Sequence, residues 1–563
     1  MNREKIFLSL FFLSISLYIS NLNYSLPNDY NIIIFWFSIL IIFSTLMLQI
    51  FRSKSDPKII LLEIFIIYLL LHLVYQVGYF GLRGSDSYFE YNFLKKILSQ
   101  GHFLLEGWIE GWPIIHIFSA ILCTITKLDA LTVAKFIPSV ISSLIVFPLY
   151  LLVFSLYKEK NVAMLATLVY GTIPQFVYFE SLFVKEAYGL LIIISLFYLI
   201  YTANIKKDSR FAFLSVILIP VLVLSHQFTS FMFLILMTIY LTLLFVFSNF
   251  SKINIANIER IDNYNINNVY ILLFVVLISY WTYCEVFIFK IFHNIFYNII
   301  GVEEYTSYAN QISLGSPIIT LKGKIIYYGF YFFHVLFAGL LIQRIILVKN
   351  RLKIEDLLFT VFFILCGIYG FLALYVLGSL IYPLRFLGHA WLFGIIPLIG
   401  YVCTLRNANY KKCLLFTLFV FILFNIYNID PSYISGNPSV LGATSNYEDY
   451  MIARTIVFPS YYYLNDSNAV YYADAGVSGA IYDIQEVDMS TKLRSVYNMK
   501  DFDNSSNIAI INEKSLLHNI EIIKQKSDSD YSKIIKIISY KDMINVNKIC
   551  EVSNGYYILK GGR

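Results

Sequence analysis

Residues 58–91 read KIILLEIFIIYLLLHLVYQVGYFGLRGSDSYFEY. The part up to residue 80 is apolar and is as long as the run of about 20 residues that a helix needs to cross a bilayer. Polar and acidic residues begin directly after it, at 82–91. The stretch therefore predicts a membrane span that leads into a polar loop, and the rest of the chain can be divided around this point.

The composition excludes a soluble protein. Of 563 residues, 58% are hydrophobic and only 14% are charged, whereas soluble domains carry about 25% charged residues. The six cysteines form no Cys-x-x-Cys pair, so we expect neither a disulfide framework nor a zinc site.

Further apolar runs predict an all-α polytopic membrane domain with about 13 transmembrane helices. The first run has no small-residue cleavage site and a second follows closely, so it is predicted to be a retained span and not a signal peptide. The predicted spans lie near 5–22, 31–51, 58–80, 131–157, 161–181, 186–203, 211–225, 227–248, 269–290, 324–348, 356–378, 387–404 and 413–429.

The charges in the loops predict the orientation. With the N-terminus in the cytoplasm, the inner segments hold 19 Lys and Arg, and the outer loops before the tail hold seven. This bias follows the positive-inside rule. Residues 113–128 are apolar too, but a span there would invert every later loop. We therefore expect a helix in the outer interface within a large outer loop, 81–130.

Residues 430–563 have a different character from the transmembrane domain, 1–429. Strand-like runs occur at 469–473, 508–511, 534–539 and 556–560, and an amphipathic helix is predicted at 515–526. We expect a small soluble α/β domain on the extracytoplasmic side of the plasma membrane.

The first candidate site residue is Asp86, at the opening of the outer loop. Ser87 and Glu90 have the spacing of a capping box, which would start a helix just after Asp86. A carboxylate near a helix N-terminus stays ionised, as a general base or a metal ligand must be. The alternative is that Asp86 only caps the helix.

Two other groups of acidic and basic residues are predicted at the outer face. Lys185 and Glu186 open a span, where charges are costly unless they are paired or functional; Lys185 could simply pair with a neighbouring carboxylate. Glu106 lies beside Trp108 and Trp112, a combination that suits a sugar platform, although Trp also anchors helices at the interface.

His226 and Arg385 are the remaining candidates. His226 interrupts the apolar run 211–247 beside Gln227, and a lone histidine of this kind can be purely structural. Arg385 lies before the span 387–404. If it faces inward, its guanidinium could bind a phosphate through two hydrogen bonds; otherwise it extends to the lipid headgroups.

The order of these segments resembles the GT-C superfamily of membrane glycosyltransferases, which includes aminoarabinose transferases, protein mannosyltransferases and, more distantly, oligosaccharyltransferase catalytic subunits. The likeness covers mainly 80–250 and 380–400. The segments that carry it are Gly84-Ser-Asp-Ser-Tyr-Phe-Glu90, Trp112-Pro-Ile-Ile-His-Ile-Phe118, Ala134-Lys-Phe-Ile-Pro-Ser-Val-Ile-Ser142, Lys185-Glu186, and Leu384-Arg-Phe-Leu387 with Pro397.

The resemblance implies transfer of a sugar from a polyprenyl- or dolichyl-phosphate carrier to a glycan, lipid or protein acceptor. Asp86 and Glu186 would be the catalytic acids and would hold Mn²⁺ or Mg²⁺ if a metal takes part. Arg385, His226, Lys185 and Glu106 would bind the substrate and the lipid phosphate. Membrane lipids are the other expected partners, and no nucleic acid is expected.

Two departures from the family stand out. The Trp-Trp-Asp motif of oligosaccharyltransferases is absent, since the five tryptophans are never adjacent, and this argues against transfer of whole glycans to asparagine. Two spans also precede the one that leads into the outer loop. An exporter or polymerase of lipid-linked glycans, or a non-catalytic membrane scaffold, remains as an alternative function.

Overall fold

The structure is a computed structural model, and helices account for most of its described residues. The described residues are 3–20, 29–52, 56–77, 82, 85–102, 111–249, 263–283, 321–347, 353–375, 383–429, 471–473, 493–495, 508–512, 546–552 and 556–561. The predicted helix at 515–526 and the strand-like run at 534–539 lie outside them.

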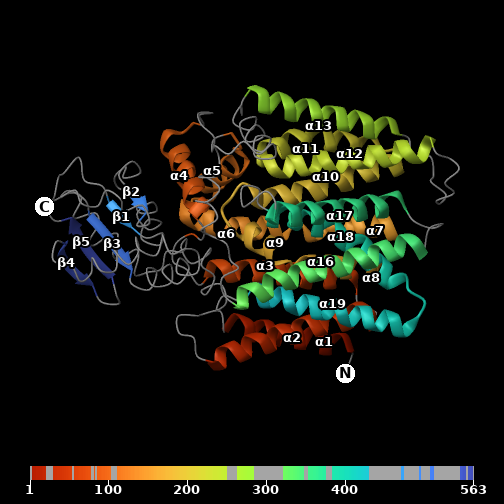
Figure 1. Cartoon of the computed structure of the whole chain (residues 1–563), viewed down its shortest axis with the longest axis horizontal. Helices are drawn as coiled ribbons and strands as arrows, with labels where there is room; N and C mark the ends of the chain where they lie inside the picture. The colour runs from red at the N-terminus through yellow and green to blue at the C-terminus, as the bar shows by residue number, and fades with distance from the viewer. Residues whose placement is uncertain are drawn as a thin grey trace.

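Within the described part, a helix covers each of the predicted apolar runs (Figure 1). The bounds are α1 Arg3–Ser20, α2 Asp29–Arg52, α3 Pro57–Val77, α4 Ser85–Gln100, α5 Ile114–Thr126, α6 Ala130–Ser143, α7 Val146–Tyr157, α8 Lys160–Tyr170, α9 Pro174–Ser181, α10 Glu186–Lys206, α11 Ser209–Ser225, α12 Gln227–Asn249, α13 Asn263–Tyr283, α16 Leu321–Leu347, α17 Ile354–Tyr375, α18 Pro383–Thr404 and α19 Ala408–Ile429.

The protein is an integral membrane protein with a helical membrane domain. Six described helical segments are long and apolar enough to cross a bilayer, and they lie at 130–157, 186–206, 227–248, 328–347, 386–404 and 408–426. The helix at 113–128 is α5, whose 13 residues span about 20 Å at 1.5 Å per residue. That is shorter than a hydrocarbon core of about 30 Å. The orientation of the chain in the membrane stays a prediction.

Two of the predicted spans are each made of two helices. The span 131–157 is interrupted between α6 and α7, and the span 161–181 between α8 and α9. At the second break, a Cβ on Gly171 would lie 1.9 Å from Cε2 of Tyr68 on α3, so only glycine fits there. Pro174 then starts α9. The second break thus lies directly against Tyr68 of α3.

The centre of the helical bundle is α18, in which nearly all residues of the apolar segment 386–404 are buried. It packs most extensively against α17 and also against α8 and α16. Trp391 on α18 is fully buried among Phe330, Phe337, Phe363 and Phe421. The helices run side by side, with α1 and α2 along one edge and α13 along the opposite edge in Figure 1.

The described part of the tail contains a five-stranded mixed sheet of order β2-β1-β3-β5-β4. Its strands are β1 Tyr471–Ala473, β2 Leu493–Ser495, β3 Ile508–Asn512, β4 Val546–Val552 and β5 Tyr556–Gly561. β1 pairs in parallel with β2 and β3, whereas β5 is antiparallel to β3 and β4. β1, β3 and β5 occupy three of the four strand-like runs in the sequence; β2 and β4 were not expected.

The start of α6 depends on a single capping carboxylate, and this gives a first prediction. Asp129 accepts hydrogen bonds of 2.8 Å from the Thr132 backbone N–H and 2.6 Å from its hydroxyl. These bonds hold the pKa of Asp129 below its ordinary value. Asp129→Ala should therefore lower the free energy of unfolding by about 1 kcal/mol near neutral pH.

The effect should depend on pH in a defined direction. Since the pKa of Asp129 is lowered by folding, the cap stabilises fully above the ordinary aspartate range and loses this contribution as the pH falls through the folded value. The thermal unfolding midpoints of wild type and Asp129→Ala should therefore become equal at acid pH. Asp129→Asn still caps the helix but does not titrate, so its midpoint should stay above that of Asp129→Ala at acid pH as well. A constant gap for Asp129→Ala across the whole range would contradict the assignment.

Candidate functional site

The buried carboxylate of Glu90 on α4 lies close to basic side chains from two other segments of the chain. Glu90 is 8% exposed. Its Oε2 lies 2.7 Å from Nε2 of His116 on α5, and its Oε1 lies 3.4 Å from Nζ of Lys185. Nζ of Lys185 also lies 5.2 Å from the ring centroid of Trp112. We call Glu90, Trp112, His116 and Lys185 the Glu90 cluster.

Aromatic packing fixes the α5 side of the Glu90 cluster. The His116 ring is fully buried and makes edge contacts with Phe93 of α4, at 4.7 Å, and with Phe183, at 6.2 Å between ring centroids. Trp112 is also fully buried. Water is excluded around the buried ammonium of Lys185. The Glu90 carboxylate and the indole face of Trp112 therefore have to stabilise its charge in place of water. The cluster therefore combines one acid with two basic groups.

Glu186 directly follows the lysine of the Glu90 cluster. It is the first residue of α10, and it is 5% exposed. The N-terminus of a helix stabilises an anion through the helix dipole and the free N–H groups of the first turn. Two neighbouring residues of one turn thus contribute a cation and a carboxylate to the same region.

Asp86 stands one helical turn before Glu90. It is the second residue of α4, so the expectation that it precedes the helix was wrong: α4 begins at Ser85, and Ser87 lies inside it. The capping-box interpretation of Ser87 and Glu90 is wrong as well, because the Glu90 carboxylate contacts His116 and Lys185. Residues four apart share a helix face, which puts positions 86 and 90 on one face; the side chain of Asp86 lies outside the description.

The other predicted site residues are only partly described. Lys185 lies beside Glu90, which fits the alternative that it pairs with a neighbouring carboxylate. His226 marks the break between α11 and α12 and is buried, with its Nδ1 2.7 Å from the Thr229 hydroxyl. Arg385 is the third residue of α18, but its side chain is not described. Glu106 lies outside the described residues.

Sequence reasoning missed Glu90 and His116 as partners, and it missed a buried contact of α3. Nε2 of His72 lies 3.2 Å from Oε2 of Glu180, and the Tyr170 hydroxyl donates to Oε1 of Glu180 at 2.8 Å. One signal for this contact was available: His72 and Gln76 are polar residues four apart within an apolar span. Polar residues inside a span usually face other protein groups.

The described residues do not by themselves assemble a metal site. No three His, Cys, Asp or Glu side chains among them lie close enough to share an ion. The Mn²⁺ or Mg²⁺ site that the sequence suggests at Asp86 and Glu186 stays a prediction, because the side chain of Asp86 is not described.

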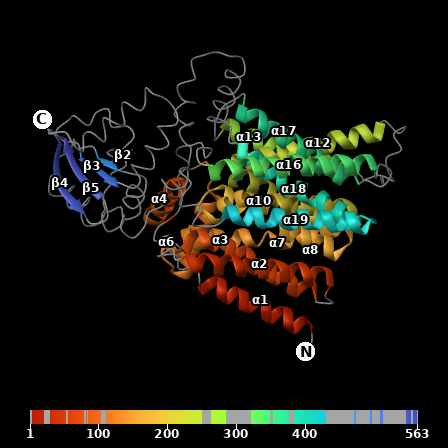
Figure 2. The ribbon, with the colours of Figure 1, turned by 60° about the horizontal axis from the view of Figure 1, so that its bottom comes forward.

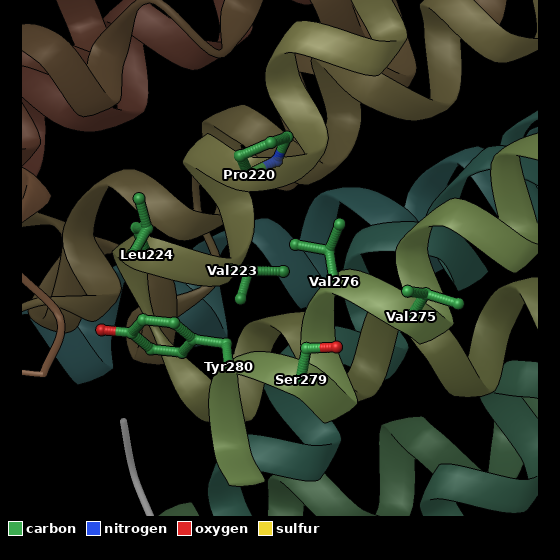
Figure 3. Close-up of a pocket in the computed structure, with 7 residues that line it drawn as sticks. All are labelled: Pro220, Val223, Leu224, Val275, Val276, Ser279 and Tyr280. Atoms are coloured by element: carbon green, nitrogen blue, oxygen red, sulfur yellow. The ribbon is translucent and has the colours of Figure 1, made fainter. Parts of the chain in front are cut away.

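An apolar groove lies between α11 and α13 (Figure 3). Its volume is about 440 Å³. The residues that line it are Pro220, Val223, Leu224, Val275, Val276, Ser279 and Tyr280. The hydroxyl of Tyr280 donates a hydrogen bond to the carbonyl of Gly111, the residue before Trp112. The contacts of Gly111 with Tyr280 and of Trp112 with Lys185 thus link the groove to the ammonium group of the Glu90 cluster.

No family model and no curated protein matches the chain. Among solved structures, an Archaeoglobus fulgidus oligosaccharyltransferase tethered to an acceptor peptide is similar at 12% identity over 89% of this chain and 74% of that one, with a TM-score of 0.51. ArnT from Cupriavidus metallidurans, bound to undecaprenyl phosphate, matches at 9% identity over 90% of this chain and 98% of that one, with a TM-score of 0.47. The likeness to the oligosaccharyltransferase shows that the two chains share a fold, as the sequence resemblance implied.

Proposed function

We propose that the protein is a glycosyltransferase that moves a sugar from a polyprenyl- or dolichyl-phosphate carrier to an acceptor hydroxyl. The observation that carries this proposal is the connection between an apolar groove and a buried cation: Tyr280 lines the groove and bonds to Gly111, and Lys185 lies over the adjacent Trp112. A polyprenyl phosphate has the matching parts, a long apolar chain and an anionic head. The GT-C fold supports the same reading.

Each candidate side chain would have a separate role in the transfer reaction. Asp86 would accept the proton of the acceptor hydroxyl, a contribution of about 10²–10⁴-fold. Lys185 and Arg385 would bind the phosphate, which leaves with the electrons of the broken sugar–oxygen bond, and fixed charges in a dry site stabilise that anion strongly. Glu186 would orient the acceptor. His226 and Glu106 would contact the phosphate or the sugar.

A divalent cation is a separate part of the proposal. Mn²⁺ or Mg²⁺, if bound, would be held by Asp86 and Glu186, and it would add positive charge next to the departing phosphate. Glu186 is buried at the N-terminus of α10, and carboxylate oxygens are the ligands that these ions prefer.

The proposal also includes the orientation and the division of the chain. Residues 1–429 would form the membrane domain with the N-terminus in the cytoplasm, and 430–563 a soluble domain on the extracytoplasmic side. The charge bias of the loops supports this orientation. Further support comes from Figures 1 and 2, in which the sheet lies beyond the end of the bundle that carries α4.

The test uses purified full-length protein in lipid vesicles with a panel of polyprenyl-phosphate sugars, and it measures release of the free polyprenyl phosphate with and without Mn²⁺ or Mg²⁺. We expect release from at least one donor, and loss of release in Glu186→Gln. Asp208→Asn, a partly exposed carboxylate that pairs only with Arg210 among the described residues, is the control and should behave as wild type. Binding of the lipids without release from any donor would instead favour an exporter or a scaffold.

A further inference from the structure

The turn between α9 and α10 carries both Lys185 and Glu186, yet it has few backbone bonds of its own. Within 182–187 the bonds are those from Val184 N–H to the Leu182 carbonyl, at 2.9 Å, and from Ala187 N–H to the Val184 carbonyl, at 3.1 Å. Such a turn leaves carbonyl groups without helical partners. Buried carbonyls of this kind need donors from elsewhere in the fold.

Side chains from α6 and α3 provide these donors. The hydroxyl of Ser142 lies 3.0 Å from the Glu180 carbonyl and 2.9 Å from the Ala187 carbonyl. These two carbonyls lie on opposite sides of the turn, so one hydroxyl hydrogen shared between them joins the end of α9 to the start of α10. From α3, Nε2 of Gln76 donates to the carbonyl of Ser181.

The His72–Glu180 contact holds the α9 end of the turn through side chains. The Ser143 hydroxyl donates to the Ser139 carbonyl at 2.7 Å and lies 3.0 Å from Nδ1 of His72. Nε2 of His72 lies 3.2 Å from Oε2 of Glu180, so the imidazole connects α6 to the last turn of α9.

All the donors of this set are buried, since Gln76, Ser142 and His72 are each no more than 1% exposed. Water cannot replace a lost donor there, so removal of the Ser142 hydroxyl leaves the Glu180 carbonyl at the end of α9 unsatisfied, whereas the Ala187 carbonyl keeps its partner within α10. A shift of the turn would move Nζ of Lys185 away from Glu90 and Trp112. Displacements near 1 Å in a reacting site can cost about 10²-fold in rate.

We infer that Ser142, supported by Gln76 and His72, is a positioning residue that holds the Lys185–Glu186 turn in place for sugar transfer. The inference rests on the proposed function for its kinetic consequence. Its structural part, that the Ser142 hydroxyl fastens the turn, is independent of any activity. We call these three side chains the turn clamp.

The test compares Ser142→Ala with Ser139→Ala in the full chain in lipid. Ser139 is on the same helix and equally buried, and its hydroxyl makes no hydrogen bond among the described residues, so its loss controls for removal of a buried oxygen. The first readout is hydrogen exchange at the amides of 182–187. We expect Ser142→Ala to speed exchange there by about tenfold or more, and Ser139→Ala to leave it at the wild-type rate.

The second readout is the kinetics of donor cleavage. We expect Ser142→Ala to lower kcat by about tenfold to a hundredfold with the donor KM nearly unchanged, because the reacting groups are misplaced while the groove still binds the lipid. Equal exchange in the two variants would overturn the clamp itself. Faster exchange with wild-type kcat would overturn its role in transfer. A wild type that cleaves no donor would refute the proposed function, while the exchange data would still decide on the clamp.

Discussion

Asp86→Asn is expected to reduce sugar transfer by about 10²–10⁴-fold while the bundle stays folded. The amide has the shape of the carboxyl group but cannot accept the proton of an acceptor hydroxyl, so the variant loses the general base. Stability should change little. Asp86 lies in the first turn of α4, where the loss of a favourable charge–dipole interaction costs about 0.3–1 kcal/mol. Single-turnover release of polyprenyl phosphate, together with a thermal unfolding curve, measures both effects.

Asp129→Asn provides the matched control. Both positions are aspartates at the start of a helix, α4 for Asp86 and α6 for Asp129. Asn caps a helix about as well as Asp, so Asp129→Asn should keep both stability and transfer. Full activity in Asp86→Asn would remove this residue from the mechanism. An equal loss in both variants would show that the effect comes from the charge of the region and not from a base.

The positions of the helices could be predicted from the sequence because they depend on local apolar composition. Hydropathy finds a run such as 211–225, and the polar Ser225-His226-Gln227 marks its end, where the structure has the break between α11 and α12. The breaks inside 131–157 and 161–181 were not predicted. The second depends on the Tyr68 ring, which occupies the space that a side chain at 171 would need, and such a contact between residues far apart in the sequence leaves no periodic signal.

The candidate site could be predicted only in part for the same reason. Lys185 and Glu186 were found because charges at the start of an apolar span are unusual. Glu90 was assigned to a capping box because local spacing was the only information about it. Its partners His116 and Lys185 are 26 and 95 positions away. Arg344 was likewise counted as an inner-loop charge, whereas it is buried in the last turn of α16.

Breaking the buried ion pair of Arg344 should have the largest effect on stability. The guanidinium of Arg344 lies 2.6 and 3.2 Å from the two carboxylate oxygens of Asp356, and it also donates to the Pro397 carbonyl at 2.7 Å. The Tyr157 hydroxyl donates to the same carboxylate. One contact set thus joins α16, α17, α18 and α7. Arg344→Met would leave a buried carboxylate without its cation, a loss of about 3–5 kcal/mol.

A double-mutant cycle distinguishes this explanation from a simple packing defect. Asp356→Leu should destabilise by a similar amount, because it leaves the guanidinium buried and unpaired, but Arg344→Met with Asp356→Leu should lose much less than the sum, since apolar groups of similar volume can replace a buried pair. The pair of Arg210 and Asp208, joined at 2.8 Å with side chains that are 87% and 21% exposed, is the control. Arg210→Met should leave the unfolding midpoint in lipid unchanged, because water solvates the remaining carboxylate. Additive losses at 344 and 356 would show that the two charges do not depend on each other.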